Sequence, residues 1–247
     1  MTLAISGPSG TGKSTIVSII KNCLATANPG LKVATIGGDS FFIGPKPDSY
    51  WTQAPKESPD SVDMIALRTA VAAATSDDAG NDLLLLEGFL LIQDAPLMLY
   101  VDAVLFLNCD PAVCLQRRLA RSERSDHEAE GLKVYFAKHV WPGYLQHTAP
   151  AIAKLRATVA AAVIPDARPR LFEIDGTLPL DEVTTLAVNA LPTLLDERFA
   201  CEKNAQPALF SSRAAFEPPE EGSKKTSVVA AAQGGGFVYG PEHHTSG

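Results

Sequence analysis

The sequence predicts an α/β fold in which a five-stranded parallel sheet is flanked by helices. Short apolar runs alternate along the chain with longer segments of helical periodicity, an order typical of such sheets. The run 83–86 is apolar at every position, as expected of a strand that is buried on both faces. With 247 residues, 46% of them hydrophobic, the chain can bury a large core. We therefore expect a folded domain over residues 1–200.

The expected elements follow one another in strand–helix order. Strands are expected at 3–6, 32–36, 83–86, 103–107 and 171–174, and helices at 13–25, 58 to about 75, from 111, about 132–162 and 181–199. Ser58 and Pro59 indicate a helix start, with Ser58 as the cap and Pro59 in the first helical position. Pro142 is expected to kink or restart its helix.

Two segments stand apart from this order. Residues of about 118–132 are polar and charged, and we expect them to form a mobile lid between two helices. Residues 201–247 are rich in Ala, Gly, Ser, Pro and charge, and lack apolar periodicity. This composition predicts a disordered tail.

Charge and composition exclude several classes of partner. The net charge of −7 argues against a nucleic-acid-binding face. No apolar run approaches the roughly 20 residues that span a bilayer, and the chain opens directly on a strand, so we expect a cytoplasmic protein without a membrane partner. Four cysteines without paired spacing fit a reducing compartment, with Cys109 and Cys114 as small buried side chains. The oligomeric state is left open, and a monomer is compatible with the sequence.

A phosphate-binding loop follows the first strand. The segment reads Gly7-Pro8-Ser9-Gly10-Thr11-Gly12-Lys13-Ser14-Thr15, which fits the P-loop pattern. Glycines let several backbone N–H groups aim at one phosphate, and the start of the following helix adds its positive dipole end. A lysine and a hydroxyl at the positions of Lys13 and Ser14 can reach the β- and γ-phosphates and Mg²⁺, respectively. The sequence therefore predicts a site for a nucleoside triphosphate, with ATP and Mg²⁺ as cofactors.

Three acidic residues are expected at the ends of other strands, where parallel sheets bind their ligands. Asp39 follows the second strand, and its carboxylate can orient an attacking hydroxyl and accept its proton, or contact the metal. Glu87 ends the third strand and is a candidate for holding Mg²⁺. Asp175 follows the fifth strand, where a plain Asp-Gly turn is an equally open interpretation.

Arginines gather near the expected lid. Arg117, Arg118, Arg121 and Arg124 lie at the end of one helix and in the polar segment after it. Guanidinium groups there could neutralise a transferring phosphoryl group, and a solvated basic face is the alternative. Together with the P-loop and the acidic residues, these arginines are groups that phosphoryl transfer could use.

The chain resembles the nicotinamide riboside kinases, within the uridine-kinase-like P-loop nucleoside kinases. The wider group is suggested by Ile5-Ser6-Gly7 before the P-loop and by Asp39-Ser40-Phe41-Phe42. The narrower family is suggested by Leu86-Glu87-Gly88-Phe89-Leu90-Leu91 and by Tyr135-Phe136-Ala137-Lys138-His139-Val140-Trp141-Pro142-Gly143-Tyr144, and Ser58-Pro59-Asp60-Ser61-Val62-Asp63 is similar to fungal members. These blocks lie between residues 3 and about 177.

The resemblance implies a role for each matching residue. ATP would contact residues 7–15, Arg117, the lid arginine Arg121, and Asp175-Gly176-Thr177 beside the adenine. Asp39 would accept the proton of the ribose 5′-hydroxyl, with Lys13 and Arg121 as the other catalytic groups. Ser14, Asp39 and Glu87 would serve the metal. Phe42, Glu57, Arg124 and Tyr135 would contact the nucleoside, with Tyr135 stacked on the base.

The chain departs from the family in two places. The family has an aromatic residue followed by Asp before the second helix, to stack on the base and bind the ribose diol, whereas this chain has Lys56-Glu57. Glu57 retains a carboxylate for the diol, and Tyr50 or Trp51 could replace the missing aromatic ring. Ser40 stands where the family has a second acid. The preferred nucleoside is thus nicotinamide riboside, with uridine or cytidine as the alternative.

Two other functions remain as alternatives. A GTPase-like switch would use Asp77-Asp78-Ala79-Gly80, which matches Asp-x-x-Gly but precedes the third strand, and the chain has no Asn-Lys-x-Asp sequence. A homologue that binds the nucleotide without turnover is suggested by Lys56-Glu57 alone.

Overall fold

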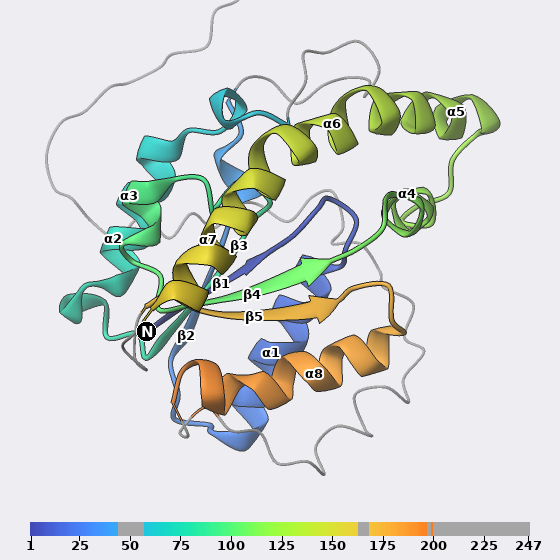
Figure 1. Ribbon diagram of the computed structural model, residues 1–247. Helices are drawn as coiled ribbons and strands as arrows, with labels where there is room; N and C mark the ends of the chain where they lie inside the picture. The colour runs from blue at the N-terminus through green and yellow to red at the C-terminus, as the bar shows by residue number, and fades with distance from the viewer. Residues whose placement is uncertain (44–56, 163–167, 197–198, 200–247) are drawn as a thin grey trace, which may run out of the picture. The chain divides into compact units, whose positions relative to one another are not determined.

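A parallel sheet forms the centre of the computed structural model, which describes residues 1–43, 57–162, 168–196 and 199. The strands are β1 (Thr2–Ser6), β2 (Val33–Gly37), β3 (Leu83–Glu87), β4 (Ala103–Asn108) and β5 (Arg170–Asp175). They lie side by side in the order β2-β3-β1-β4-β5, and every neighbouring pair is parallel (Figure 1). The predicted five-stranded parallel sheet is confirmed.

Helices cover both faces of this sheet. Helices α1 (Lys13–Ala27) and α8 (Leu180–Leu194) lie on one face, and α2 (Met64–Thr75), α3 (Ala95–Met98) and α7 (Ala149–Ala161) lie on the other (Figure 1). Side chains of a strand alternate between the two faces. Accordingly Leu3 and Ile5 pack with α1 and α8, whereas Ala4 packs with α2, α3 and α7.

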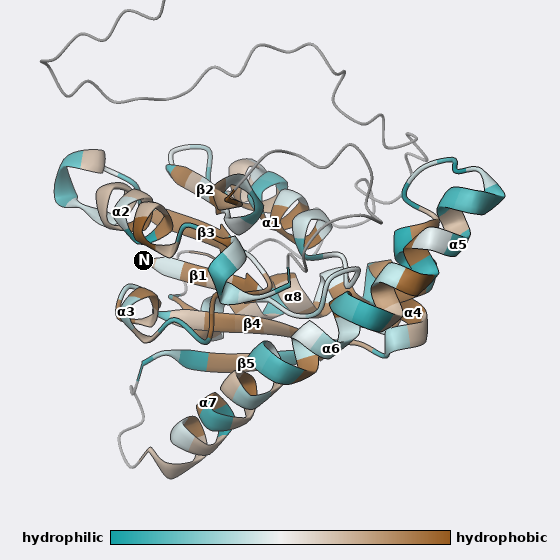
Figure 2. Ribbon diagram, turned by 90° about the horizontal axis from the view of Figure 1, so that it is seen from above, coloured by the Kyte–Doolittle hydropathy of each residue, from teal (hydrophilic) through white to brown (hydrophobic). Residues whose placement is uncertain are grey.

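The central strands are apolar on both sides. Figure 2 shows β4 as a brown, hydrophobic ribbon between helices in which teal and brown alternate. The four leucines of β3 are each at most 1% exposed. This burial on both faces accounts for the unbroken apolar run in the sequence, as predicted.

The second helix begins later than expected. Residues Pro59–Ser61 form a single 3₁₀ turn, and Val62 then pairs with Phe42 in an isolated antiparallel bridge. This bridge holds Val62 in an extended conformation, so α2 can start only at Met64. Its cap is Asp63, whose carboxylate accepts a 2.9 Å hydrogen bond from the Ala66 N–H.

The segment expected to be irregular contains a helix. Helix α4 spans Pro111–Leu119, and α5 begins at Asp126 and runs to Tyr135, instead of beginning near 132. A capping box fixes its start, because Ser125 and Glu128 each bond the other's backbone N–H. The expected lid therefore consists of the end of α4, a loop at 120–125 and the first turns of α5.

Pro142 does not break the helical path that follows α5. Two π-helical turns, Phe136–Val140 and Tyr144–Thr148, flank the short α6 (Trp141–Gly143). Proline has no N–H to donate, and its position in the first turn of α6 avoids that loss. The last helix also differs from expectation: α8 ends at Leu194, soon after the internal Pro192, instead of reaching 199.

Some predicted features lie outside the described residues. These are Tyr50, Trp51 and Lys56 in the connection after β2, and the tail at 201–247. What the sequence predicts for these residues therefore stays a prediction.

Candidate active site

The P-loop connects the central strand β1 to α1. Gly7, Gly10 and Gly12 have φ values of 148°, 104° and 94°, in the region that favours glycine. A Cβ on Gly7 or Gly10 would also lie 2.5 Å from the carbonyl oxygen of Leu107 or Cys114, respectively. No side chain caps the start of α1 and no acidic residue lies in its first turn. The loop and helix start thus present backbone N–H groups suited to a phosphate.

Lys13 is a buried lysine whose pKa is affected by the charges of several other predicted site residues. Its side chain is 8% exposed, and Nζ donates 3.1 Å hydrogen bonds to the carbonyls of Gly7 and Pro8. Burial lowers the pKa of Lys13, and the charges of Glu87 and Asp39 oppose that effect. The charges of Arg121 and Glu57 also act on this ammonium group. Three acidic residues and a lid arginine therefore lie within electrostatic range of the P-loop lysine.

Ser14 and Glu87 meet at the end of the sheet. Glu87 is the last residue of β3, and β3 pairs with β1 so that Glu87 lies beside Ile5. The Ser14 hydroxyl donates a 2.8 Å hydrogen bond to Oε1 of Glu87. Two hard oxygen atoms this close fit Mg²⁺, which takes one or two protein ligands and fills its other positions with phosphate oxygens and water. Among the described residues no cluster of three or more His, Cys, Asp or Glu could hold a metal alone.

Asp39 lies on the exposed side of the same edge. The 3₁₀ turn Gly38–Phe41 follows β2 directly, and Asp39 within it is exposed. Gly38 packs tightly, since a Cβ there would lie 3.3 Å from the Glu87 carbonyl oxygen. Phe42 comes next, with its ring centroid 6.1 Å from that of Phe89. The structure thus places Asp39 and Phe42 on the β2–β3 side of the P-loop.

Glu57 is a buried acid on this side. It is 8% exposed, and burial raises its pKa to about 7, although the charges of Arg118 and Lys13 lower it. The charge of Asp39 raises it further. Gly143 of α6 contacts its backbone closely. Glu57 is therefore brought to the P-loop, together with Lys13 and Asp39.

The arginines fall into two groups. Arg117 donates to backbone carbonyls at Thr11 (3.3 Å), Gly176 (2.6 Å) and Leu178 (3.3 Å), so its guanidinium group ties the P-loop to the β5–α8 loop. Arg118 donates to the Ser9 hydroxyl of the P-loop. The position of Arg117 suits holding the loops that surround a nucleotide.

Arg121 and Arg124 line a pocket between the end of α4 and the first turns of α5. The pocket has a volume of about 270 Å³ and is lined by Arg118, Arg121, Ser122, Glu123, Arg124, Glu128 and Leu132. Arg124 donates 3.0 Å hydrogen bonds to the carbonyls of Leu119 and Ser122, which stabilise the loop between α4 and α5. The charge of Arg121 reaches Lys13. The lid arginines thus form a cationic wall beside the phosphate loop.

The β5–α8 loop is a tight turn. Oδ1 of Asp175 accepts hydrogen bonds from the Thr177 N–H (2.8 Å) and hydroxyl (2.5 Å), and these bonds lower the pKa of Asp175. Gly176 approaches β4 so closely that a Cβ would lie 2.7 Å from the Asn108 carbonyl oxygen. Asp175 therefore forms the expected turn and its carboxylate shapes the loop, and the contact of this loop with adenine stays a prediction.

Tyr135 is buried. It is 8% exposed, and it packs in an apolar cluster with Cys114, Phe136 and Val140. Its ring centroid lies 5.4 Å from that of His139. In this conformation the ring packs within the protein, so the expected stacking on a base stays a prediction.

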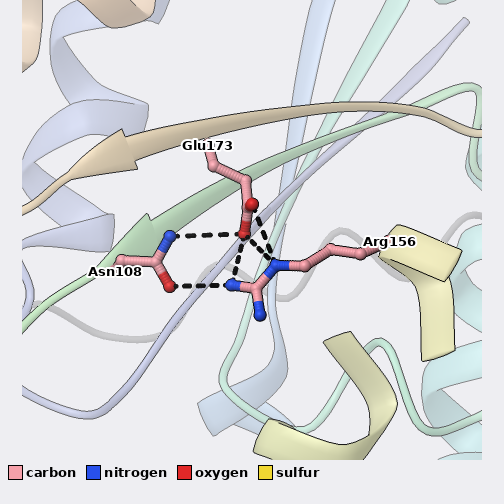
Figure 3. Close-up of polar contacts among 3 residues, drawn as sticks. All are labelled: Asn108, Arg156 and Glu173. Carbon is pink, nitrogen blue, oxygen red and sulfur yellow. Dashed lines mark hydrogen bonds and ion pairs between the residues drawn. The ribbon is translucent and has the colours of Figure 1, made fainter. Parts of the chain in front are cut away.

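One polar cluster at this edge was missed in the sequence. Arg156 of α7 donates to both carboxylate oxygens of Glu173 at 2.6–2.9 Å, and the Asn108 side chain contacts both residues at 3.2 Å (Figure 3). The cluster joins α7 to the ends of β4 and β5. An arginine in an Ala-rich helix and a glutamate inside a strand were the signals that could have revealed it.

The alternative GTPase motif lies at the wrong edge. Asp77–Ala79 form a 3₁₀ turn that precedes β3, whereas the P-loop follows β1. Because β1 and β3 are parallel, the two segments lie at opposite ends of the sheet. This motif therefore does not face the phosphate loop.

Comparison with known proteins adds little to this site. In the part of the chain that the structure describes, no helix is long and apolar enough to cross a membrane. No protein-family model matches the chain, and neither does any curated protein sequence. Among solved structures, the unliganded structure of a sugar kinase from Janibacter sp. is similar at 16% identity and a TM-score of 0.43, over 80% of this chain and 96% of that chain. A likeness this distant assigns no substrate.

Proposed function

We propose that this protein is a kinase that transfers the γ-phosphoryl group of ATP to the 5′-hydroxyl of a ribonucleoside. Nicotinamide riboside is the favoured acceptor, and uridine or cytidine is the alternative. The observation that carries the proposal is the surroundings of Lys13, on which Glu87, Asp39, Arg121 and Glu57 all act. Donor-side and acceptor-side groups thus meet at one P-loop lysine.

The donor half of the site would hold ATP. The loop of residues 7–15 cradles the phosphates, and Lys13 exchanges its two carbonyl partners for phosphate oxygens. Ser14 and Glu87 would hold Mg²⁺, which when bound neutralises phosphate charge. Asp175, Gly176 and Thr177 would lie beside the adenine, on a loop that Arg117 ties to the P-loop.

The acceptor half lies on the β2–β3 side. Asp39 would accept the proton of the 5′-hydroxyl as the hydroxyl oxygen attacks the γ-phosphorus in line. The bond between the γ-phosphorus and the bridging oxygen would break, and ADP would leave with that oxygen. Glu57 would bind the ribose diol, and Phe42 and Tyr135 would face the base. Arg121 would close over the phosphates from the lid, and Arg124 would contact the nucleoside from the same segment.

A panel of acceptors tests the proposal. The purified full chain is incubated with ATP and Mg²⁺ and, separately, with nicotinamide riboside, uridine, cytidine, adenosine and ribose, and ADP and monophosphate products are measured. We expect a monophosphate from a ribonucleoside, with nicotinamide riboside giving the highest kcat/KM. Nicotinamide riboside giving no product would exclude the favoured acceptor, and ATP binding without turnover on any nucleoside would favour the inactive homologue.

Asp39→Asn provides the matched control. It keeps the size of the side chain but removes the proton acceptor, so kcat should fall by a factor of about 100 or more while ATP binding persists. Turnover equal to wild type would exclude Asp39 from this role.

A further inference from the structure

Gly143 and Glu57 contact each other more closely than any other residue at position 143 would allow. A Cβ built on Gly143 would lie 2.6 Å from Cβ of Glu57 and 2.9 Å from its carbonyl oxygen. Real Cβ atoms essentially never approach other atoms this closely, and both contacts are with groups near the backbone. A flexible side chain could move away, but these atoms can yield only if the chain at residue 57 moves.

The helix that carries Gly143 has an unusual path. Backbone N–H groups of Trp141 and Ala149 bond the carbonyls of Phe136 and Tyr144, five residues earlier in each case. These two π-helical turns lie on either side of α6, and such turns occur frequently at functional sites. They bracket the three residues of α6, the last of which is Gly143.

The carboxyl group of Glu57 lies among the charges of the phosphate site. Arg118 of α4, Lys13 of α1 and Asp39 of the 3₁₀ turn after β2 act on it, and α6 itself carries no charged residue. The side chain is almost fully buried. Its position relative to Lys13 therefore depends on how closely α6 packs against its backbone.

We propose that Gly143 is a positioning residue, which seats Glu57 so that its carboxyl group meets the acceptor at a fixed distance from Lys13. The proposal rests on the function proposed above. A Cβ at position 143 displaces residue 57 from α6, and the carboxyl group moves with it. ATP would be held by the P-loop backbone and by Lys13, and Glu57 is not among its contacts, so its binding should be left largely unchanged.

The kinetic test uses Gly143→Ala, with nicotinamide riboside and uridine as acceptors. We expect KM for the acceptor to rise about tenfold or more, because small displacements of positioning groups have large effects, while KM for ATP changes less than about twofold. Gly30→Ala is the matched control, since a Cβ at Gly30 meets nothing within 4 Å. It should behave as wild type. Equal increases in KM for ATP and for the acceptor would overturn the proposal.

A double-mutant cycle separates positioning from general damage to the fold. In a Glu57→Ala background there is no carboxyl group to displace, so Gly143→Ala should add little further loss of kcat/KM for the acceptor. If the two losses multiply instead, Gly143 acts through some other part of the structure, and the proposal is wrong.

A measurement that needs no acceptor keeps this inference apart from the proposed function. Carboxyl groups are labelled with a water-soluble carbodiimide and glycine ethyl ester, and the modified residues are located by peptide mass spectrometry. We expect Glu57 to be protected in wild type and labelled several-fold faster in Gly143→Ala, with exposed Asp39 labelled equally in both. Unchanged protection of Glu57 would overturn the proposal even if a nucleoside is phosphorylated. Faster labelling with no nucleoside phosphorylated would refute the proposed function and leave the seating of Glu57 by Gly143 standing.

Discussion

The Ser14 hydroxyl donates its 2.8 Å hydrogen bond to the Glu87 carboxylate from the first turn of α1 to the end of β3. The contact links α1, which follows β1 and the P-loop, to β3, the strand that pairs in parallel with β1. A hydroxyl and a carboxylate that already touch need little rearrangement to share one cation.

Removing either partner should therefore weaken the binding of Mg²⁺. Ser14→Ala and Glu87→Gln are each expected to raise the Mg²⁺ concentration for half-maximal ATP turnover by a factor of about 10–100. Titration of Mg²⁺ at fixed ATP measures it. Ser18→Ala is the control, because its hydroxyl bonds only the Ser14 carbonyl on the same helix. Unchanged Mg²⁺ dependence in both variants would exclude the pair as the metal site.

Glu57 should make the protein less stable as pH rises. Its pKa is raised from 4.5 to about 7, so below about pH 4.5 the group is protonated in both folded and unfolded chains. As pH rises towards 7, the unfolded chain releases the proton while the folded chain retains it, and the free energy of unfolding falls. The loss is on the order of 3 kcal/mol.

Glu57→Gln isolates this contribution because glutamine does not titrate. The difference in free energy of unfolding between the variant and wild type should grow from about pH 4.5 to about pH 8, as measured by urea denaturation. Asp60→Asn, an exposed neighbour, is the control. A difference that is constant with pH would contradict the raised pKa.

Arg117 is expected to matter for ATP through the loops it holds. Arg117→Lys keeps the charge but cannot reach three carbonyls, so the P-loop and the turn at Gly176 lose their common partner. We expect weaker ATP binding by about tenfold and a loss of stability of about 1–3 kcal/mol, because part-buried carbonyls lose their donor. Calorimetric titration with ATP measures the first effect. The exposed neighbour Gln116, changed to Ala, should leave both unchanged.

The cluster of Arg156, Glu173 and Asn108 should contribute little to stability. Its ion pair is partly exposed, with side chains 44% and 30% accessible, so water and salt screen it. Hydrogen bonds from Arg156 lower the pKa of Glu173, so the contribution is present above about pH 4.5 and disappears as acid protonates the carboxylate. A double-mutant cycle of Arg156→Met and Glu173→Gln at neutral pH should give about 0.5 kcal/mol. A coupling of several kcal/mol would contradict this.

Cys109 should be the most reactive of the three cysteines that the structure describes. A hydrogen bond from Cys114 lowers its pKa, and the charge of Arg117 adds to that effect. The side chain is only partly buried, so the prediction of a buried Cys109 is wrong, whereas Cys114 is buried as expected. The hydrogen bond to Cys109 raises the pKa of Cys114, and burial raises it further. In a Cys201→Ser background, iodoacetamide should modify Cys109 first, and Cys109→Ser should remove the fast phase. A fast phase that persists in that variant would contradict the prediction.

The sheet and the P-loop could be predicted because their signals are local. A short apolar run such as β3, placed between helical segments, favours a buried strand, and the glycines of the P-loop define its path. The start of α2 could not be placed, because the bridge between Phe42 and Val62 depends on a contact between distant segments. The capping box of α5 was visible as Ser125 and Glu128, but the polar composition of the segment outweighed it.

The same difference between local signals and long-range contacts applies to the site. The spacing of the motifs places Lys13, Ser14 and Glu87 at one edge of a parallel sheet, and the structure brings them together there. The hydrogen bonds by which Arg117 ties two loops together could not be predicted, since their acceptors are backbone carbonyls far apart along the chain. Nor could the burial of Tyr135, which depends on how α5 packs against α4.

The order of the strands places different parts of the site on different sides of the P-loop. The P-loop follows the central strand, the turn with Asp39 and the end of β3 lie on one side of it, and α4 and the β5–α8 loop lie on the other. The P-loop, α4 and the β5–α8 loop would thus hold ATP, Glu87 at the end of β3 would share its Mg²⁺, and the turn with Asp39 would contact the acceptor. In a kinase built this way, changes confined to the turn after β2 can fit another alcohol while the ATP site, Glu87 included, stays as it is.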